Sequence, residues 1–589
     1  MSNFIHSVWR AGKSAILGSA SSSSRSDSPN LFVRLLRDEA GVQLILVALL
    51  LPVFIGVAAL GTESGLWAFA HMNQQGAADS AAMSATVAFS EGESPANMLL
   101  EAEAISAQYG YVNGTSGVTV TVNNPPLADS VCPPDSSYVG NTGAVEVLIE
   151  KPYSPLLSGY WSTSSVYICG RAVGILAGGS CMLATDTSAA GAFTASGGAT
   201  IDLTGCGVFS NSSANGGVSK KSCGDSICLS GSATITKPIS TDPNPKVGAV
   251  GGVGVGGGAS IPYGFTSGDQ AETNPYGGVA LPSSSTAIVT SPPLTCGPPP
   301  TSSPYTGSSK GSKITVNGSA TFNPGVYCGT ITISGGTPTF NAGSGSSTYT
   351  FEGAFTVSGG TVTLPSLSGT GGYAFGNGIA VSGGSLTTNS STYTIYNGIS
   401  VTGGTLNMNS GSSIDTIYSG ATSAAIGICV TACTATVNLG AGTYVLNSTT
   451  SSATTLSLDH SATLNSTNAT IVFTSSTNTY PAAMMNFAGD AKVKLVAPTS
   501  GATSGLVIFG DSSMPVGTQF NVGNGTQFTF TGAVDVPNGA FSFSGGTSTT
   551  SPCSQFIADT LDFSGSGSFA NNCSGTGTSA IGASAVLAE

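Results

Sequence analysis

Charged residues are scarce along the whole chain. Asp, Glu, Lys and Arg together make up 7% of the 589 residues, whereas a typical soluble domain contains roughly 25%. The 28 acidic residues outnumber the 15 basic ones, which gives a formal net charge of −13 at pH 7. Beyond residue 60 the lysines and arginines are too scattered to form a basic patch. The composition therefore argues against nucleic acid as a partner, because binding to phosphates needs clustered basic side chains.

Histidine is rare, and no cysteine precedes Cys132. All 12 cysteines lie from that residue onward, which favours an oxidising compartment for this part of the chain. Close spacing predicts local disulfides, although spacing alone does not fix the pairing. The neighbouring cysteines are Cys181 and Cys206, Cys223 and Cys228, Cys296 and Cys328, Cys429 and Cys433, and Cys553 and Cys573. A zinc site is the alternative, and it is disfavoured because the chain has only three histidines and Cys223 and Cys228 are separated by four residues.

The low charge does not indicate disorder. Disordered chains combine low hydrophobicity with high net charge, whereas 40% of this chain is hydrophobic and its mean hydropathy is +0.25. Glycine occupies 82 positions, and a chain of this length exceeds the size of one ordinary hydrophobic core. We therefore expect an elongated structure that buries its apolar residues in many small repeated layers.

One long apolar run stands out at residues 41–60, GVQLILVALLLPVFIGVAAL. It contains no charge, and as a helix it would reach roughly 29 Å, close to the hydrocarbon thickness of a membrane. Pro52 is compatible with a helix here, because lipid offers the backbone no alternative partner. A cleaved secretory signal peptide is the competing interpretation, but its apolar core would be shorter and nearer Met1. We expect an uncleaved anchor.

The residues that flank this run predict its orientation. Five basic residues precede it, and the hundred residues after it contain almost none. Because positive flanks remain in the cytoplasm, we expect a cytoplasmic tail over residues 1–37 and an exported remainder. The five basic residues are Arg10, Lys13, Arg25, Arg34 and Arg37.

The anchor continues into a segment with helical spacing, so we expect one helix over residues 38–90. Its alanines fall into two adjacent rows at i, i+4 spacing, which together form a smooth stripe. The rows are Ala77, Ala81 and Ala85, and Ala78 and Ala82. A helix of another subunit can approach such a stripe closely, and so can a sheet of the same chain. The sequence supports both interpretations equally.

Residues 91–178 predict a small α+β module. A second helical pattern ends at Gly110, and strand-like runs follow at 117–123, 144–150 and 164–176, separated by turns rich in proline and glycine. A long N-terminal helix followed by a small sheet is a pilin-like plan.

The order of features in the first ninety residues is specific. A charged flank precedes a glycine, a proline lies near the middle of the apolar run, an acid and a glycine follow it, and an alanine-rich stretch surrounds an aspartate. The positions are Gly41, Pro52, Glu63, Gly65 and Asp79. In this order the segment resembles TadE/TadG-like proteins of bacterial Tad (Flp) pilus-assembly systems.

Two positions depart from the patterns of that group. Prepilins that are cut by a prepilin peptidase carry Glu five residues after the cleavage-site glycine, whereas Leu46 stands there in this chain. Some TadG relatives also have a von Willebrand factor A domain with an Asp-x-Ser-x-Ser metal motif. The sequence that follows Asp186 does not complete this motif, so we expect no such domain.

The resemblance implies a function and a location. It implies a non-catalytic structural component of Tad-type pilus assembly or of the associated secretion, without a cofactor. The implied location is the bacterial inner membrane, with a single pass, a cytoplasmic N-terminus and a C-terminal region in the periplasm or outside the cell. Other pilus-assembly or pilin-like membrane proteins and membrane lipid are the implied partners.

A glycine-containing repeat dominates the C-terminal half. It reads TISGGTPTF at 332–340, TVSGGTVTL at 356–364, AVSGGSLTT at 380–388 and SVTGGTLNM at 400–408. A period of about 20 to 24 residues is typical of one coil of a solenoid. Val, Ile, Leu and Phe would point inward at alternate positions, and the chain would turn at Gly-Gly. We therefore expect a mainly β protein whose C-terminal part is a right-handed parallel β-helix.

The same pattern divides the rest of the chain. Weaker repeats predict the first coils at residues 179–237, and the main solenoid covers residues 313–589. Between them, residues 238–312 are rich in Gly, Pro, Ser and Thr and are expected to form a linker or an insertion.

Two other functions remain open from the sequence. A surface adhesin could use the solenoid to bind a ligand such as a surface glycan. A polysaccharide-degrading β-helix is less favoured, because such enzymes need clustered carboxylates. The nearest acidic pair, Asp559 and Asp562, lies three residues apart in a strand, so the two side chains point to opposite faces. We expect no catalytic, cofactor-binding or metal-binding residue.

Overall fold

A computed structural model describes most of the chain beyond residue 38. The described residues are 39–128, 132, 137–141, 143–156, 159, 164–177, 179–218, 223–237, 246–282, 296, 303–369, 371–411, 413–429, 434–523, 525–544, 553–570, 572–573, 575–582 and 584–588. The expected tail at residues 1–37 lies outside them. The chain forms two compact units, residues 1–70 with 153–166 and residues 71–152 with 167–589.

The first unit contains the apolar part of the long helix α3 (Glu39–Ser90). Pro52 lies inside this helix, and the side chains of Leu49 and Phe54 are 68% and 67% exposed. The most apolar stretch of α3 has a mean hydropathy of 2.1. Among the described residues, α3 is the one helix that is long and apolar enough to cross a membrane.

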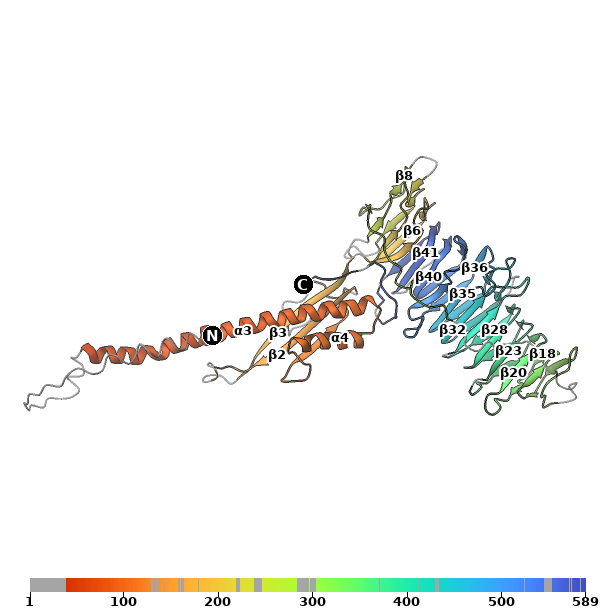
Figure 1. Ribbon diagram of the computed structural model, residues 1–589, viewed down its shortest axis with the longest axis horizontal. Helices are drawn as coiled ribbons and strands as arrows, with labels where there is room; N and C mark the ends of the chain where they lie inside the picture. Colours follow the sequence, from red (N-terminus) through yellow and green to blue (C-terminus); the bar gives the residue numbers. More distant parts are fainter. Residues whose placement is uncertain are drawn as a thin grey trace, which may run out of the picture. The chain divides into compact units, whose positions relative to one another are not determined.

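The second unit begins with a small α+β module built around the C-terminal part of α3. Helix α4 (Pro95–Gln108) starts after Ser94, whose side chain accepts a hydrogen bond from the backbone N–H of Asn97, so an N-cap fixes its first turn. Figure 1 shows α3 and α4 beside the small sheet. The strand order is β1-β2-β3-β43. Their bounds are β1 Thr119–Asn123, β2 Ala144–Tyr153, β3 Val166–Ala177 and β43 Ser584–Leu587.

The first three strands and α4 match the elements expected for residues 91–178. The fourth strand was not expected, because β43 comes from the C-terminal end of the described chain and pairs antiparallel with β3. The segment before β43 also returns to this module, where the backbone N–H groups of Gly577 and Ala580 donate to the carbonyls of Gly92 and Ser90 at 3.0 and 2.6 Å.

Strands separated by turns follow one another along the remaining described chain. The first group is β4 Ser180–Ala184, β5 Phe193–Ala195, β6 Thr200–Thr204, β7 Gly207–Ser210, β8 Asn215–Val218, β9 Cys223–Asp225, β10 Ile227–Leu229, β11 Thr234–Thr236, β12 Val247–Ala249, β13 Val253–Val255 and β14 Thr266–Ser267. The second group is β15 Lys313–Asn317, β16 Thr321–Phe322, β17 Gly325–Tyr327, β18 Thr330–Gly335, β19 Thr339–Phe340, β20 Thr348–Phe351, β21 Phe355–Val357, β22 Thr361–Leu364, β23 Gly372–Phe375, β24 Ile379–Val381, β25 Ser385–Thr388, β26 Thr392–Ile395, β27 Ile399–Val401 and β28 Gly404–Met408. The third group is β29 Ile414–Tyr418, β30 Ile426–Ile428, β31 Ala435–Leu439, β32 Gly442–Asn447, β33 Leu456–Leu458, β34 Thr463–Ser466, β35 Ala469–Thr474, β36 Ala483–Phe487, β37 Lys492–Val496, β38 Leu506–Gly510, β39 Thr518–Val522, β40 Gln527–Phe543, β41 Ser554–Phe563 and β42 Gly567–Ala570.

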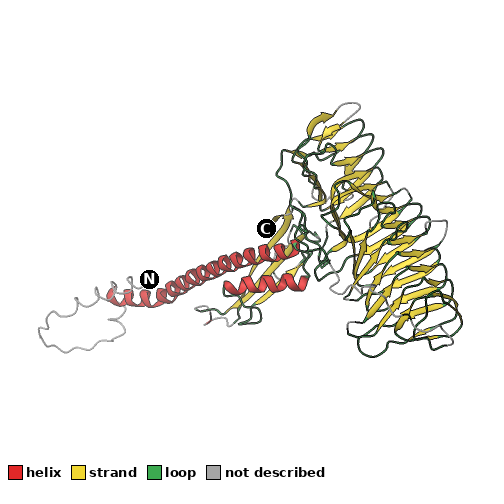
Figure 2. Cartoon of the chain, turned by 45° about the vertical axis from the view of Figure 1, so that its right-hand side comes forward, coloured by secondary structure: helices red, strands yellow, loops and turns green. Residues whose placement is uncertain are grey.

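A 34-stranded sheet unites most of these strands among the described residues. From β15 to β37 each strand pairs in parallel with the strand three places further along the chain, as in β18 with β21 and β21 with β24. The long strand β40 then pairs with β37, β38 and β39, and also with β41. Figure 2 shows the resulting stack of strands. We call residues 180–573 the repeating sheet region. The expectation of a mainly β protein with a large parallel sheet is confirmed.

The repeat places equivalent residues beside one another. Ile379 pairs with Ile399, and Tyr349, Tyr373 and Tyr393 form one continuous row. Their rings stack, with centroids 5.3 and 4.9 Å apart, and the hydroxyl of Tyr373 donates to the carbonyl of Pro365 at 2.7 Å. Each repeat therefore packs on the next through the same contacts, and this accounts for the spacing in the sequence.

Glycines turn the chain between strands, as the SGG pattern predicts. The second glycine of each turn has a positive φ, 74° at Gly360 and 70° at Gly384. A Cβ atom at Gly360 would lie 2.2 Å from the carbonyl oxygen of Gly336. Glycine is required there both for the backbone conformation and for the close approach of successive turns.

The strands at residues 180–267 precede β15 in the chain, but they do not pair with it. They lie beside the last strands of the repeating sheet region. β4 and β5 pair with β41, near the C-terminal end of the repeating sheet region, and β5 continues to β10 and β13. These early strands therefore extend the sheet beyond β41. The opposite end of the series of paired strands is formed by β15, which pairs with β18.

Part of the expected linker at 238–312 belongs to the sheet. β12, β13 and β14 pair with their neighbours at residues 247–267. The glycines in this stretch permit close packing, since a Cβ atom at Gly251 would lie 2.2 Å from the carbonyl oxygen of Ala214. The glycines at residues 247–267 thus allow close contact between backbones. The prediction of a linker was wrong for this stretch.

Candidate functional site

The alanine stripe of α3 is covered by the chain itself. Ala77, Ala78, Ala81, Ala82 and Ala85 are each 0% exposed. They belong to one apolar cluster with residues of α4, β1, β2 and β3, namely Met98, Ala102, Val120, Val145, Val147, Ile149 and Ala172. Small side chains allow the helix to approach the sheet closely. Of the two interpretations of the stripe, the structure shows internal packing.

The other motif positions are spread along α3. Gly41 and Pro52 lie within the helix, and Gly65 is exposed with no atom within 4 Å of the position of a Cβ. Asp79 accepts a hydrogen bond from Gln75 Nε2 at 2.8 Å. These residues are not brought together into a single site.

Glu63 is more deeply placed than a residue at a water boundary would be. Its side chain is buried, with 2% exposure, and its carboxylate accepts a hydrogen bond from the backbone N–H of Leu156 at 2.6 Å. Both residues belong to the first unit. A charged hydrogen bond of this kind contributes more than a neutral one, so Glu63 holds the segment at residues 153–156 against α3.

Two glutamines connect α3 to the small sheet, and sequence reasoning missed them. The buried Gln74 donates from Nε2 to the carbonyl of Ile149 on β2 and, at 2.8 Å, to that of Ile168 on β3. The neighbouring Gln75 accepts from the backbone N–H of Arg171 at 3.1 Å. The side-chain amide of Gln74 thus supplies the hydrogen-bond donors for backbone carbonyls of β2 and β3 at the contact with α3.

Arg171 on β3 and Glu146 on β2 form a buried ion pair within the same small sheet. Arg171 Nη2 lies 2.6 Å from Glu146 Oε1, and Arg171 Nε donates to the same oxygen at 2.8 Å. The Glu146 side chain is fully buried, and its second oxygen accepts from Asn123 Nδ2 at 2.9 Å. Arg171 also donates from Nη1 to the carbonyl of Cys132 at 3.1 Å.

One signal in the sequence could have revealed this pair. Arg171 is the only arginine after Arg37, and it lies inside an apolar strand pattern. A buried cation in such a strand requires a carboxylate partner. The acid in the neighbouring strand pattern, Glu146, satisfies that requirement.

Disulfides account for the cysteines of the described region. Four bonds join pairs that spacing predicted: Cys181–Cys206, Cys223–Cys228, Cys296–Cys328 and Cys553–Cys573. A fifth bond, Cys132–Cys169, joins residues 37 apart and was not predicted. Cys429 is disulfide-bonded, and its predicted partner Cys433 lies outside the described residues.

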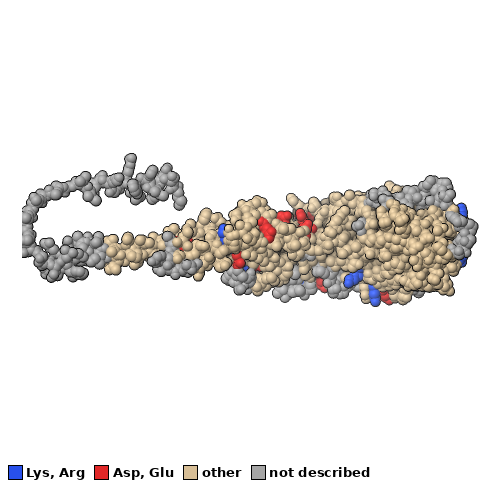
Figure 3. Space-filling view, turned by 90° about the horizontal axis from the view of Figure 1, so that it is seen from below, with Lys and Arg blue, Asp and Glu red and all other residues tan. Residues whose placement is uncertain are grey.

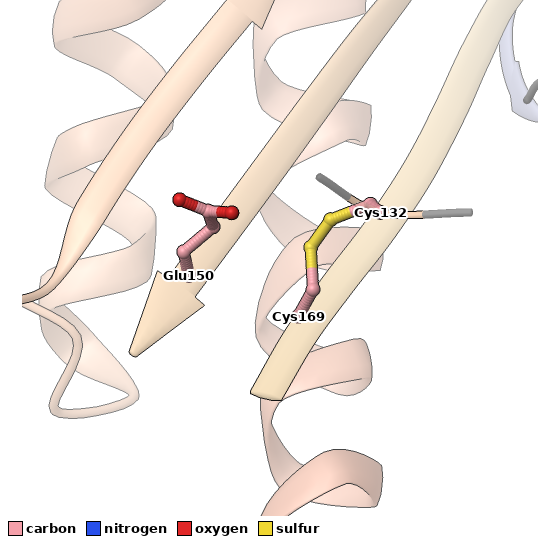
Figure 4. A group of neighbouring side chains, drawn as sticks. All are labelled: Cys132, Glu150 and Cys169. Atoms are coloured by element: carbon pink, nitrogen blue, oxygen red, sulfur yellow. A yellow bond between two sulfur atoms is a disulfide. The ribbon is translucent and has the colours of Figure 1, made fainter. Parts of the chain in front are cut away.

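One group of possible metal ligands among the described residues surrounds the unpredicted disulfide. The sulfurs of Cys132 and Cys169 and a carboxylate oxygen of Glu150 lie within 4.8 Å of one another. Figure 4 shows Glu150 beside the bonded sulfurs. Metal ions bind thiolates, and disulfide sulfurs carry no thiolate charge, so this group does not have the donors of a metal site. The group at Cys296, Cys328 and Glu352 is ruled out in the same way.

The acidic pair Asp559 and Asp562 lies in two different environments. Burial raises the pKa of Asp559 to about 6, with a smaller effect from Asp186, and Asp186 accepts from the backbone N–H groups of Ser188 and Ala189. Asp562 is exposed and accepts from the hydroxyl of Thr194. Asp559 and Asp562 therefore do not share a site, which agrees with the expected opposite faces.

Two further carboxyl groups have a strongly raised pKa. Burial raises the pKa of Glu272 to about 7 although Lys246 lies 3.7 Å away. Burial also raises the pKa of Asp535 to about 7, and Asn274 Nδ2 donates to Asp535 Oδ1 at 2.8 Å. Both acids join residues 268–282 to the sheet, a role in packing.

Comparison with known proteins gives no relative. The chain matches no protein-family model, no curated protein and no solved structure.

Proposed function

We propose that this protein is a non-catalytic, single-pass membrane-anchored component of Tad/Flp-type pilus assembly or of the associated secretion. The observation that carries the proposal is the construction of α3. Its first part is apolar and exposed, and its second part buries an alanine stripe against a small sheet. Pilin-like subunits follow this plan, and the order of motif residues from Gly41 to Asp79 supports the same assignment.

A location and partners follow from the proposal. The protein lies in the bacterial inner membrane with residues 1–37 in the cytoplasm and the rest in the periplasm or outside the cell. The five disulfides that join pairs of described residues support an oxidising compartment for that part. Its partners are other pilus-assembly or pilin-like membrane proteins and membrane lipid.

For the repeating sheet region we propose a right-handed parallel β-helix. Parallel pairing of each strand from β15 to β37 with the third one after it, at an interval of 20 residues from Ile379 to Ile399, supports this fold. The region has the role of a rigid exported body attached to the pilin-like module.

Reporter fusions test the orientation. A reporter that is active only after export is fused after Ser24 or after Ser180. We expect activity at Ser180 and none at Ser24, because the basic residues keep the tail in the cytoplasm. The reverse pattern would overturn the topology.

Complementation of a deletion strain tests the role in pilus assembly. We expect loss of pili on deletion and recovery with the full chain. A variant with Leu49→Arg and Phe54→Arg should fail, since each arginine near the centre of a membrane helix costs about 2.5 to 3.5 kcal/mol. The control carries Leu66→Arg and Met72→Arg at exposed positions of α3 beyond the apolar run and should restore pili. Normal pili in the deletion strain would contradict the proposal and favour the adhesin.

A further inference from the structure

A ladder of amide side chains runs along one outer face of the repeating sheet region. Asn407 Nδ2 donates to Thr387 Oγ1 at 3.2 Å, Asn438 Nδ2 to Asn407 Oδ1 at 2.8 Å, and Asn465 Nδ2 to Asn438 Oδ1 at 2.9 Å. The register places these residues directly beside one another on β25, β28, β31 and β34. The next residue in the row is Lys494 on β37.

A second row of polar side chains lies beside this ladder. It occupies the positions two residues earlier in the same strands, so both rows face outward while the leucines and valines between them point into the core. The row consists of Thr361, Ser385, Thr405, Thr436 and Thr463, and it continues to Lys492 on β37 and Gln527 on β40. Both rows therefore carry a lysine on β37, and the asparagine row continues to Thr529 on β40.

The ladder opens into a groove of about 950 Å³. Asn407, Asn438 and Asn465 are half-buried along it, and Lys494 is exposed at its end. Lys494 is the one charged residue among the described residues that line this groove. Lysines and arginines are otherwise few, as Figure 3 shows for one face of the molecule, so a positive end to a neutral groove is a distinctive feature.

The amides retain hydrogen-bonding capacity toward the groove. A primary amide has two N–H donors and two acceptor sites. Within the ladder Asn438 donates once and accepts once, which leaves it one donor and one acceptor. Hydroxyl groups both donate and accept, so a ligand rich in hydroxyls suits this row. Because the row repeats at the strand spacing of about 4.8 Å, a polymer with regularly spaced hydroxyls can contact several amides at once.

We propose that this groove binds an acidic polysaccharide, with its hydroxyls along the asparagine ladder and a carboxylate at Lys494. The inference goes beyond pilus assembly and does not depend on it. A purely structural ladder would also join the strands, but it would give no reason for a groove along the ladder in which Lys494 is the one charged residue among the described lining residues.

Binding to polygalacturonate oligomers tests the proposal. The full chain in detergent micelles is titrated by calorimetry with the oligomer and with its methyl ester, which has the same hydroxyls without the charge. We expect binding of the acid and weaker binding of the ester. Lys494→Gln should reduce affinity for the acid about fivefold, equal to about 1 kcal/mol for an exposed ion pair, and should leave affinity for the ester unchanged.

Two asparagine variants separate binding from folding. Asn438→Ala interrupts the ladder and should weaken binding of both oligomers. The control is Asn486→Ala, since Asn486 pairs with Asn521 in a different row of the sheet and is expected to leave binding unchanged. Melting temperatures establish that each variant is folded.

Three outcomes would overturn the proposal. These are no binding of either oligomer by the full chain, equal affinity for the acid and the ester, and equal losses from Asn438→Ala and Asn486→Ala. Lys494→Gln should still support pilus assembly, so failure of one proposal is distinguishable from failure of the other.

Discussion

The small α+β module and the repeating sheet region are stabilised in different ways. In the module each contact occurs once: Gln74 connects α3 to β2 and β3, and Arg171 pairs with Glu146. In the repeating sheet region a residue contacts its own counterparts, as Tyr373 stacks between Tyr349 and Tyr393. Stability in the module therefore depends on a few groups, whereas in the sheet it is distributed over many equivalent neighbours.

The largest effect is expected from Glu146→Ala in the module. This change leaves Arg171, whose side chain is 12% exposed, without its carboxylate. Removing one partner of a buried ion pair costs about 3 to 5 kcal/mol, measured as the free energy of unfolding of the module by denaturant titration.

A double variant is the matched control. Glu146→Leu combined with Arg171→Met removes both charges and keeps similar volumes, so it should be far less destabilising than Glu146→Ala. Equal losses in the two variants would show that packing volume, and not the unpaired charge, governs this position.

A smaller effect is expected when a whole repeat is removed from the sheet. Deletion of residues 379–398 removes β24, β25 and β26 and joins Gly378 to Ile399, which is the register partner of Ile379. The neighbours then pair as before, because each repeat contacts only the adjacent ones. We expect a folded, β-rich protein by circular dichroism with a modestly lower melting temperature.

Deletion of residues 379–388 serves as its control. It removes half a repeat, so Asn389 occupies the place of Ile379 and the register is lost. If the full-repeat deletion unfolds the region as completely as this control, the sheet is not held by interchangeable neighbours, and the contrast with the module fails.

The smallest effect is expected from Asp535→Asn, and it depends on pH. Burial raises the pKa of Asp535 from 3.8 to about 7 in the folded protein. The fold thus favours the protonated form, and its stabilising contribution is present below about pH 4 and is lost as the pH rises toward 7. Asparagine keeps an acceptor for Asn274, so the variant should match the wild type at pH 4 and melt at a higher temperature at pH 8.

Melting temperatures from pH 4 to pH 8 check this prediction. Glu272 and Asp559 also have a raised pKa, about 7 and about 6, so part of the pH dependence should remain in the variant. Identical curves for the variant and the wild type would show that ionisation of Asp535 does not destabilise the fold.

The same contrast determines how much could be predicted from the sequence. In the repeating sheet region one pattern occurs many times, so the glycines at 336, 360, 384 and 404 and the alternating residues between them reveal strands and turns. In the module α4 and three strands follow from local patterns. The contacts that join them occur once, and neither Gln74 nor the partner of Arg171 is marked by any repeat.

Long-range closure could not be predicted for a related reason. The pairing of β3 with β43 and of β4 with β41 joins residues that no local spacing connects. For the alanine stripe, spacing identified the buried face correctly but could not say what covers it. Glu63 similarly required knowledge of the segment at residues 153–156, which lies opposite it.

The pairing of β4 with β41 also affects the timing of folding during synthesis. The backbone N–H and the side-chain hydroxyl of Thr185 both donate to the carbonyl of Ala558, a residue 373 positions later. At about 5 to 20 residues per second, a ribosome needs roughly 20 to 75 s to make the intervening chain. During that interval β4 presents an open strand edge, a known route to aggregation. The edge of β4 in the nascent protein therefore has to be protected from aggregation until β41, one of the last strands, has emerged from the ribosome.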